Sequence, residues 1–212
     1  MFYKKTVVCC LLLLFAGFSS VDAATTSKGQ SGLINIPSAY VLRNGHGGIG
    51  YFNVQNGDSF AGNISLLSNV ELSYSHWRLN GQNDKNLYGF KIALAQEEFL
   101  KPAISIGVED LSDDLDRSFY IVTSKQFPWG LRSHIGLKGG SESNGLFYGL
   151  EKEIRLTRNY MDAKSFIPVV NIMIEYDGQH FNYGAYIRSS RGLRFDIGWY
   201  DDTFRTGIQL EF

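Results

Sequence analysis

The most regular feature of the sequence is an alternation of apolar and polar residues within short stretches. The clearest cases are residues 171–177, Asn-Ile-Met-Ile-Glu-Tyr-Asp, residues 193–200, Leu-Arg-Phe-Asp-Ile-Gly-Trp-Tyr, and residues 204–212, Phe-Arg-Thr-Gly-Ile-Gln-Leu-Glu-Phe. Side chains on a strand point alternately to its two faces. Each stretch therefore predicts a strand with one apolar face and one polar or charged face.

Stretches of this kind fill nearly all of the chain after residue 45 and predict about twelve strands. The expected ranges are 46–55, 58–67, 70–80, 86–96, 102–111, 116–126, 130–140, 145–155, 166–177, 180–189, 192–201 and 203–212. Turn residues such as Asp177-Gly178 separate them. Parallel strands need long crossovers, so the short spacing predicts an antiparallel up-and-down meander. Strand 116–126 is ambiguous, because residues 119–122, Phe-Tyr-Ile-Val, are apolar on both faces.

Two architectures share this pattern. A soluble barrel or sandwich turns its apolar faces inward, whereas a transmembrane barrel turns them toward lipid and its polar faces toward the lumen. The predicted strands have the length that a tilted strand needs to cross a bilayer, and closure removes the sheet edges that lipid does not tolerate. We therefore expect an all-β, antiparallel transmembrane β-barrel. A secreted or periplasmic β-sandwich is the alternative.

The N-terminus predicts secretion. Lys4 and Lys5 precede an apolar run over residues 7–18, and residues 21–23, Val-Asp-Ala, offer a cleavage site. This is the pattern of a secretory signal peptide, here residues 1–23. We expect residues 24–45 to form an irregular N-terminal segment and residues 46–212 to form the barrel. Both cysteines, Cys9 and Cys10, lie in the signal peptide, so we expect no disulfide and no thiolate site.

A set of charged residues shares the polar faces of the C-terminal strands, and we call it the lumen network. Its members are Arg132, His134, Lys138, Glu151, Glu153, Glu175, Asp177, Arg188, Arg194 and Asp196. Paired carboxylates can perform acid–base chemistry. We favour a salt-bridged interior instead, because a closed interior needs its charges to be paired.

Other motifs give no positive sign of catalysis or cofactor binding. Residues 45–50, Gly-His-Gly-Gly-Ile-Gly, fit a dinucleotide-binding motif by letter, but a strand follows where a helix is needed. The histidines have no metal-ligand spacing, and no G-x-S-x-G elbow occurs. Ser133 and His134 are adjacent and would point to opposite faces of a strand. We expect no catalytic residues, no cofactor and no metal site.

Two features allow a more local prediction. The irregular segment contains Leu33, Ile34 and Ile36, so it either plugs or lines the mouth of the barrel, or packs on its rim. Aromatic residues near the predicted strand ends fit the girdles that flank the apolar band of a membrane barrel. They are Trp77, Trp129, Trp199, Tyr200 and Phe212.

The last strand resembles the C-terminal signature of bacterial outer-membrane β-barrels, because it alternates strictly and ends in the aromatic Phe212. That resemblance implies a Gram-negative outer membrane and an insertion machinery that reads this terminal aromatic. It also implies that this strand closes the barrel against the first strand.

A second resemblance concerns the family. Residues 32–39, Gly-Leu-Ile-Asn-Ile-Pro-Ser-Ala, with Val41-Leu42 and the glycine-rich strand entry 45–51, resemble the opening of YjbH-type outer-membrane proteins. Similar pieces follow in order: residues 106–110, Ser124-Lys125, and residues 175–178, Glu-Tyr-Asp-Gly, with Asn182, Gly184 and Tyr186. The family is linked with exopolysaccharide production. Its members are often much longer, whereas this chain holds one barrel-sized unit.

The resemblance implies a non-enzymatic role in exopolysaccharide production or secretion. A small-solute pore or transport barrel and a lipid-modifying outer-membrane enzyme are the alternatives. The expected partners are outer-membrane lipid and lipopolysaccharide, the barrel insertion machinery, and polysaccharide or its export proteins. The net charge of −1 comes without a basic stripe, so we expect no nucleic-acid partner.

Overall fold

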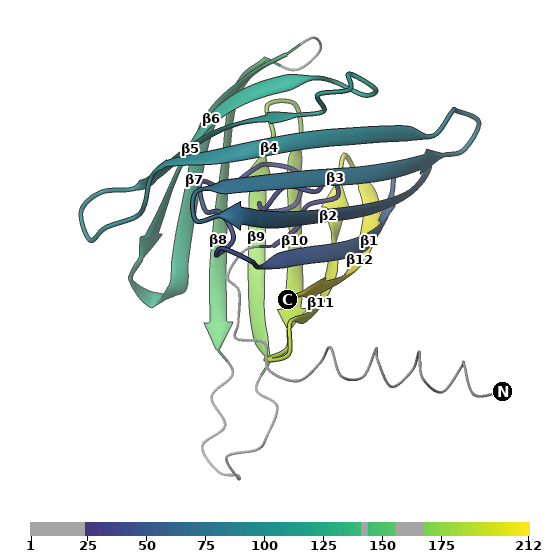
Figure 1. Ribbon diagram of the computed structural model, residues 1–212. Coiled ribbons are helices and arrows are strands. Elements are labelled where there is room, and N and C mark those ends of the chain that lie inside the picture. Colours follow the sequence, from purple (N-terminus) through teal and green to yellow (C-terminus); the bar gives the residue numbers. More distant parts are fainter. Residues whose placement is uncertain (1–23, 141–143, 156–167) are drawn as a thin grey trace, which may run out of the picture.

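The computed structural model describes residues 24–212 except 141–143 and 156–167, so the predicted signal peptide lies outside the described residues. The described chain forms twelve antiparallel strands that close into one barrel, with each strand beside its neighbours in sequence and β12 beside β1 (Figure 1). The strands are β1 (Gly47–Val54), β2 (Gly57–Leu67), β3 (Val70–Leu79), β4 (Lys85–Ala95), β5 (Ala103–Glu109), β6 (Ser118–Phe127), β7 (Leu131–Gly140), β8 (Gly145–Arg155), β9 (Val169–Tyr176), β10 (Phe181–Arg188), β11 (Leu193–Tyr200) and β12 (Thr203–Glu211). A short 3₁₀ turn, η1 (Pro128–Gly130), joins β6 to β7. The predicted all-β antiparallel barrel and its strand number are confirmed.

Helices contribute little to this architecture. In the part of the chain that the structure describes, no helix is long and apolar enough to span a membrane.

Local turn chemistry sets the register of the hairpins. Asp201 and Asp202 both have positive φ, 48° and 56°. Two positive-φ residues between antiparallel strands are the signature of a type I′ turn, whose twist matches that of the flanking strands. This turn fixes the pairing of Tyr200 with Thr203 and of the whole β11–β12 hairpin.

The barrel has two mouths. The terminal mouth holds the start of β1 and the end of β12, with the β2–β3, β4–β5, β6–β7 and β10–β11 turns. The distal mouth holds the β1–β2, β3–β4, β5–β6, β9–β10 and β11–β12 turns. At the terminal mouth the barrel closes: Gly47 N donates to Phe212 O at 2.7 Å, and Phe212 N donates to Gly47 O at 2.9 Å.

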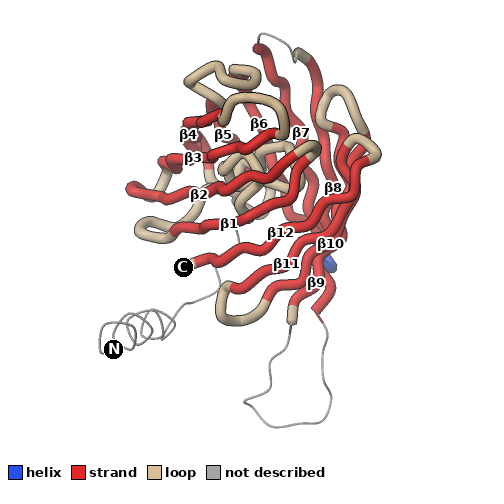
Figure 2. The backbone as a smooth tube through the Cα atoms, turned by 90° about the vertical axis from the view of Figure 1, so that its right-hand side faces the viewer, coloured by secondary structure: helices blue, strands red, loops and turns tan. Residues whose placement is uncertain are grey.

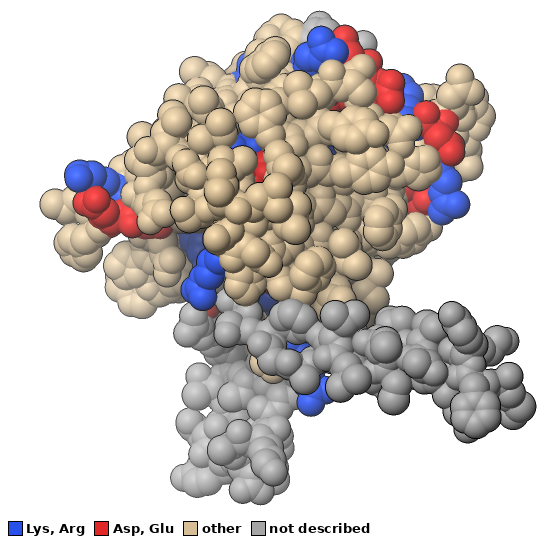
Figure 3. All heavy atoms as spheres, in the orientation of Figure 1, with Lys and Arg blue, Asp and Glu red and all other residues tan. Residues whose placement is uncertain are grey.

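The wall is apolar outside and mostly polar inside, as the alternation predicts. On β11 the outward side chains of Phe195 and Ile197 are 48% and 53% exposed, whereas the inward Arg194 is 1% exposed. On the face drawn in Figure 3, charged side chains gather at two edges of the molecule, and most of the wall between them is uncharged.

The inner face is not uniformly polar, and here the sequence prediction was incomplete. Tyr120, Val122, Phe147, Met173 and Tyr186 point inward and are buried in one apolar cluster. This explains why the predicted strand 116–126 is apolar on both faces. In the structure this strand is β6, which buries Tyr120 and Val122 inside the barrel and exposes its other apolar residues outside.

Two expected girdle residues are placed differently. Tyr200 faces the lumen, where its hydroxyl accepts a hydrogen bond from Asn35 Nδ2 at 3.3 Å and its ring lies 3.8 Å from the Arg205 guanidinium. Trp77 is 8% exposed and packs inside the barrel with Phe52 and Leu87. Its indole Nε1 donates a hydrogen bond to Ser75 Oγ at 3.0 Å. The expectation that Trp77 and Tyr200 belong to an outer girdle was wrong, because alternation along β3 and β11 turns these two positions inward.

Removal of residues 210–212 should prevent closure. It deletes the paired backbone of Leu210 with Ile49 and of Phe212 with Gly47, and the freed groups of β1 would lose their partners in the barrel wall. Protein refolded in detergent should no longer migrate faster unboiled than boiled on a gel. Phe212→Leu keeps the backbone pairs and should preserve the fast band. A normal fast band in the truncated protein would contradict this account of closure.

Candidate functional site

The N-terminal segment fills the lumen. Residues 24–42, which we call the plug, lie within the ring of strands (Figure 2), and most of their side chains are buried. Leu33 and Ile36 are 3% and 2% exposed and pack into the apolar cluster of the inner wall. Of the two expectations for this segment, the structure shows the plug rather than a leader on the rim.

The plug consists of two successive loops. In the first, Thr25 bridges to Ser31, and in the second, Gly32 bridges to Pro37. The tip of the first loop carries Lys28, which pairs with Glu109 at 3.0 Å, at the distal end of β5. Burial lowers the pKa of Lys28, but the Glu109 carboxylate outweighs this effect, so its pKa lies above the usual value.

Close backbone approach explains the glycine between the two loops. A Cβ added at Gly32 would lie 2.1 Å from the carbonyl oxygen of Ile36 and 3.0 Å from the Cα of Pro37. The second loop can therefore fold this tightly only because residue 32 has no side chain. Its N–H also donates to Ala24 O at 2.8 Å, which ties the two loops together.

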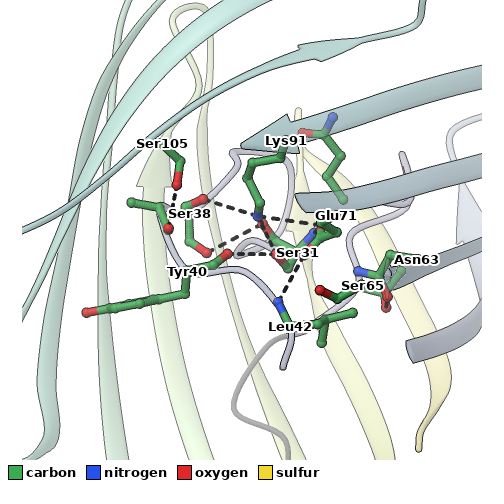
Figure 4. Close-up of polar contacts among 12 residues, drawn as sticks. Ser31, Ser38, Tyr40, Leu42, Asn63, Ser65, Glu71, Lys91 and Ser105 are labelled. Carbon is green, nitrogen blue, oxygen red and sulfur yellow. Dashed lines mark hydrogen bonds and ion pairs between the residues drawn. The ribbon is translucent and has the colours of Figure 1, made fainter. Parts of the chain in front are cut away.

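A buried ion pair of the wall, Glu71 with Lys91, anchors the plug at Ser31, where the first loop ends (Figure 4). Glu71 accepts hydrogen bonds from Ser31 N at 2.8 Å and Ser31 Oγ at 2.6 Å. Lys91 donates to the carbonyl oxygens of Ser31 at 2.9 Å and Ser38 at 3.2 Å. The two charged groups lie 3.5 Å apart, and both side chains are fully buried. Wall and plug thus share one polar cluster.

Sequence reasoning missed Glu71 and Lys91. The signal was present in the pairing: the two residues lie directly opposite each other on β3 and β4. Opposite charges at paired positions of adjacent strands stabilise one another. The expected strands 70–80 and 86–96 contain both residues, but the lumen network was drawn from the later strands.

A second anchor holds the tip of the second loop. Glu175 accepts from the backbone N–H groups of Ile34 at 3.0 Å, Asn35 at 2.9 Å and Ile36 at 3.4 Å. Successive N–H groups of this kind form a concave site for an anion. Asp177 accepts from Asn35 Nδ2 at 3.0 Å. Residues 32–39 and 175–178, the two most specific parts of the sequence resemblance, therefore contact each other.

A third anchor involves a serine and a histidine. Ala39 N donates to Ser124 Oγ at 2.8 Å, and His134 Nδ1 lies 2.8 Å from the same oxygen. Ser105 Oγ donates to Ala39 O at 2.6 Å. Ser124 and His134 are 1% and 2% exposed, so the plug covers this pair and uses it for its own backbone.

The rest of the lumen network lies in the wall. Arg132 pairs with Glu151 at 2.7 Å and with Glu153 at 3.5 Å. Arg194 pairs with Asp196.

Arg188 and Arg194 also contact residues that are not members of the lumen network. Arg188 pairs with Glu211, 3.5 Å away on β12, which was not in the expected set. The guanidinium of Arg194 also lies 3.4 Å from the ring centroid of Tyr186.

Lys138 is not in these pairs and lines a cavity at the distal mouth.

The placement of the side chains gives no support for metal binding. Among the described residues, no group of three or more His, Cys, Asp or Glu side chains could hold a metal ion.

Loss of the buried anchor should loosen the plug. Both cysteines of the chain precede residue 24. In a protein that begins at residue 24, Ala39→Cys therefore introduces the sole thiol. Modification of this thiol by a polar reagent should be slow, and Glu71→Ala should speed it by about a hundredfold to a few thousandfold, because breaking a buried ion pair costs about 3–5 kcal/mol.

Glu98→Ala is the control, since Glu98 forms an exposed pair with Lys101 in the β4–β5 turn. It should leave the labelling rate unchanged. Equal rates with and without Glu71, in protein that still shows the fast gel band, would show that this anchor does not hold the plug.

Comparison with known proteins agrees with the sequence resemblance. No curated protein matches the chain. The family model of YjbH, described as exopolysaccharide biosynthesis protein YbjH, matches residues 24–166. The matched range contains the whole plug and its Glu71–Lys91 anchor, and it covers more than half of the chain. The chain belongs to the YjbH family.

Proposed function

We propose that this chain is a non-enzymatic outer-membrane β-barrel that serves exopolysaccharide production or secretion. The observation that carries the proposal is a barrel with an apolar exterior and a lumen closed by an anchored plug. The family supplies the link to exopolysaccharide, and the barrel supplies the argument for the membrane.

The exterior supports a membrane location. Strands β2, β3, β4, β6, β7 and β8 have 10 or 11 residues, close to the ~9–11 that a tilted strand needs to cross a bilayer. Closure leaves no unpaired sheet edge, which lipid would penalise.

Aromatic rings gather on the outside near the distal mouth. Trp199 stacks on Tyr183 with ring centroids 5.4 Å apart and meets Phe204 edge-on at 5.2 Å. Tyr176 and Phe181 form a second cluster on β9 and β10, with centroids 5.0 Å apart. Rings at one level fit a girdle at a membrane interface.

The plug argues against an open pore. Wall side chains and plug backbone bond to one another across the lumen at Glu71, Lys91, Ser124 and Glu175. It also argues against the lipid-modifying enzyme, because Ser124 and His134 lie beneath the plug and bind its backbone. A barrel of this kind suits binding, assembly or retention of a polymer.

A strain that lacks the chain should release less exopolysaccharide, and its own gene should restore the amount. Fractionation should place the protein in the outer membrane. The alternatives have distinct readouts: steady conductance of the purified protein in planar bilayers would favour a solute pore, and altered lipid A or phospholipid profiles would favour an enzyme. Unchanged polymer in the deletion strain would overturn the exopolysaccharide role.

The tolerance of the exterior to charge should depend on depth. Ile197→Arg, in the middle of β11, should impair assembly, at a cost of about 2–4 kcal/mol near the bilayer midplane. Leu111→Arg, an exposed residue of the β5–β6 turn at the distal mouth, should cost about 0–1 kcal/mol.

The measurement is the amount of heat-modifiable protein in the outer-membrane fraction. In a soluble barrel both side chains would face water and both variants should assemble normally. That result would contradict the membrane location and leave the fold intact.

A further inference from the structure

The distal mouth contains a cavity of about 390 Å³. The two loop tips of the plug, Lys28 and Asn35, line it from within, and the ends of the strands form its walls. Volumes of ~300–1,000 Å³ are typical of small-molecule sites. The cavity is therefore large enough for a ligand, and the plug closes it toward the terminal mouth.

Carboxamide side chains are the commonest polar groups around this cavity. They are Asn35, Gln55, Asn56, Gln82 and Gln179. A carboxamide both donates and accepts hydrogen bonds, and the hydroxyl groups of a saccharide do the same. Such a lining suits a ligand with many hydroxyls better than an apolar one.

Two of the charged groups at the cavity are already satisfied. Lys28 pairs with Glu109 at 3.0 Å. Asp177 accepts hydrogen bonds from Asn35, Asn182 and the backbone N–H groups of Gln179 and His180. These groups shape the cavity and hold the plug tip.

Two other cations, Arg205 and Lys138, also line the cavity and can bind a ligand there. Arg205 lies over the Tyr200 ring, 3.8 Å from its centroid, and its Nε has no hydrogen-bond partner among the described residues. Lys138, on β7, also lines the cavity. Asp116 also lines the cavity and is engaged in contacts of its own. Lys138 and Arg205 together favour an anionic group.

We infer that this cavity binds a saccharide that carries a carboxylate. The carboxylate lies between Lys138 and Arg205, and the hydroxyls face the carboxamides. Because the plug tips close the inner end, the cavity takes one end or one side branch of a polymer rather than a threaded chain. The inference rests on the proposed function, since it makes an acidic exopolysaccharide the ligand.

Calorimetric titration of the purified full chain in detergent tests this. Tri-galacturonic acid should bind, and maltotriose, which has hydroxyls but no carboxylate, should bind far more weakly. Lys138→Gln should weaken tri-galacturonic acid binding about tenfold or more, because hydrogen bonds to charged groups contribute about 1.5–3 kcal/mol. Lys138→Arg should retain most of the affinity.

Lys101→Gln is the matched control: it makes the same charge change on an exposed lysine at the terminal mouth, and it should bind as the unchanged chain does. Arg205→Gln should behave like Lys138→Gln, and the heat-modifiable gel band shows that each variant is folded. Should Arg205→Gln fail to fold, Lys138→Glu, which should abolish binding, replaces it as the second variant.

Equal binding of the two trisaccharides, or full affinity in Lys138→Gln, would overturn the inference. So would an equal loss in Lys101→Gln, which would reveal attraction to overall charge. These outcomes are separate from the exopolysaccharide role of the proposed function, which is overturned by normal exopolysaccharide in the deletion strain.

Discussion

An irregular chain enclosed in a barrel must find a partner for every backbone group, and this constraint governs the whole interior. The two loops of the plug pair only some of their own N–H and C=O groups, and a buried group without a partner costs several kcal/mol. Wall side chains supply the partners: Glu175 for three N–H groups, Lys91 for two carbonyls, and Ser124 and Ser105 for Ala39. The positions of these polar wall side chains therefore determine the path that the plug backbone takes through the lumen.

The same constraint explains why the interior mixes charge and hydrocarbon. Leu33 and Ile36 face an apolar part of the wall, while the backbone on either side of them faces carboxylates. A side chain of the wrong kind would leave either a buried charge or a void. The same fit places the two loop tips of the plug, Lys28 and Asn35, at the distal mouth.

The barrel could be predicted from sequence because its signal is local. Strands such as β11 alternate strictly, and the turn at Asp201-Asp202 punctuates them. The interior could be predicted only in part, because its contacts are distant in sequence: Asn35 and Glu175 are 140 positions apart, and no periodicity marks the path of residues 24–42. Trp77 shows a further limit. Its place near a strand end suggested a girdle, but the parity of the strand, which decides inside from outside, turned it inward.

The path of the plug settles how it can enter and leave. Its first residues lie near the terminal mouth, where Thr25 N donates to Gln209 Oε1 at 3.1 Å, and its last residues return to that mouth, where Tyr40 donates to Glu97 of the β4–β5 turn at 2.6 Å. The segment is therefore folded back on itself rather than threaded through. A doubled strap can be drawn out of a closed ring from one side without any chain end crossing it. The barrel and its contents are topologically separable, however tightly they are packed.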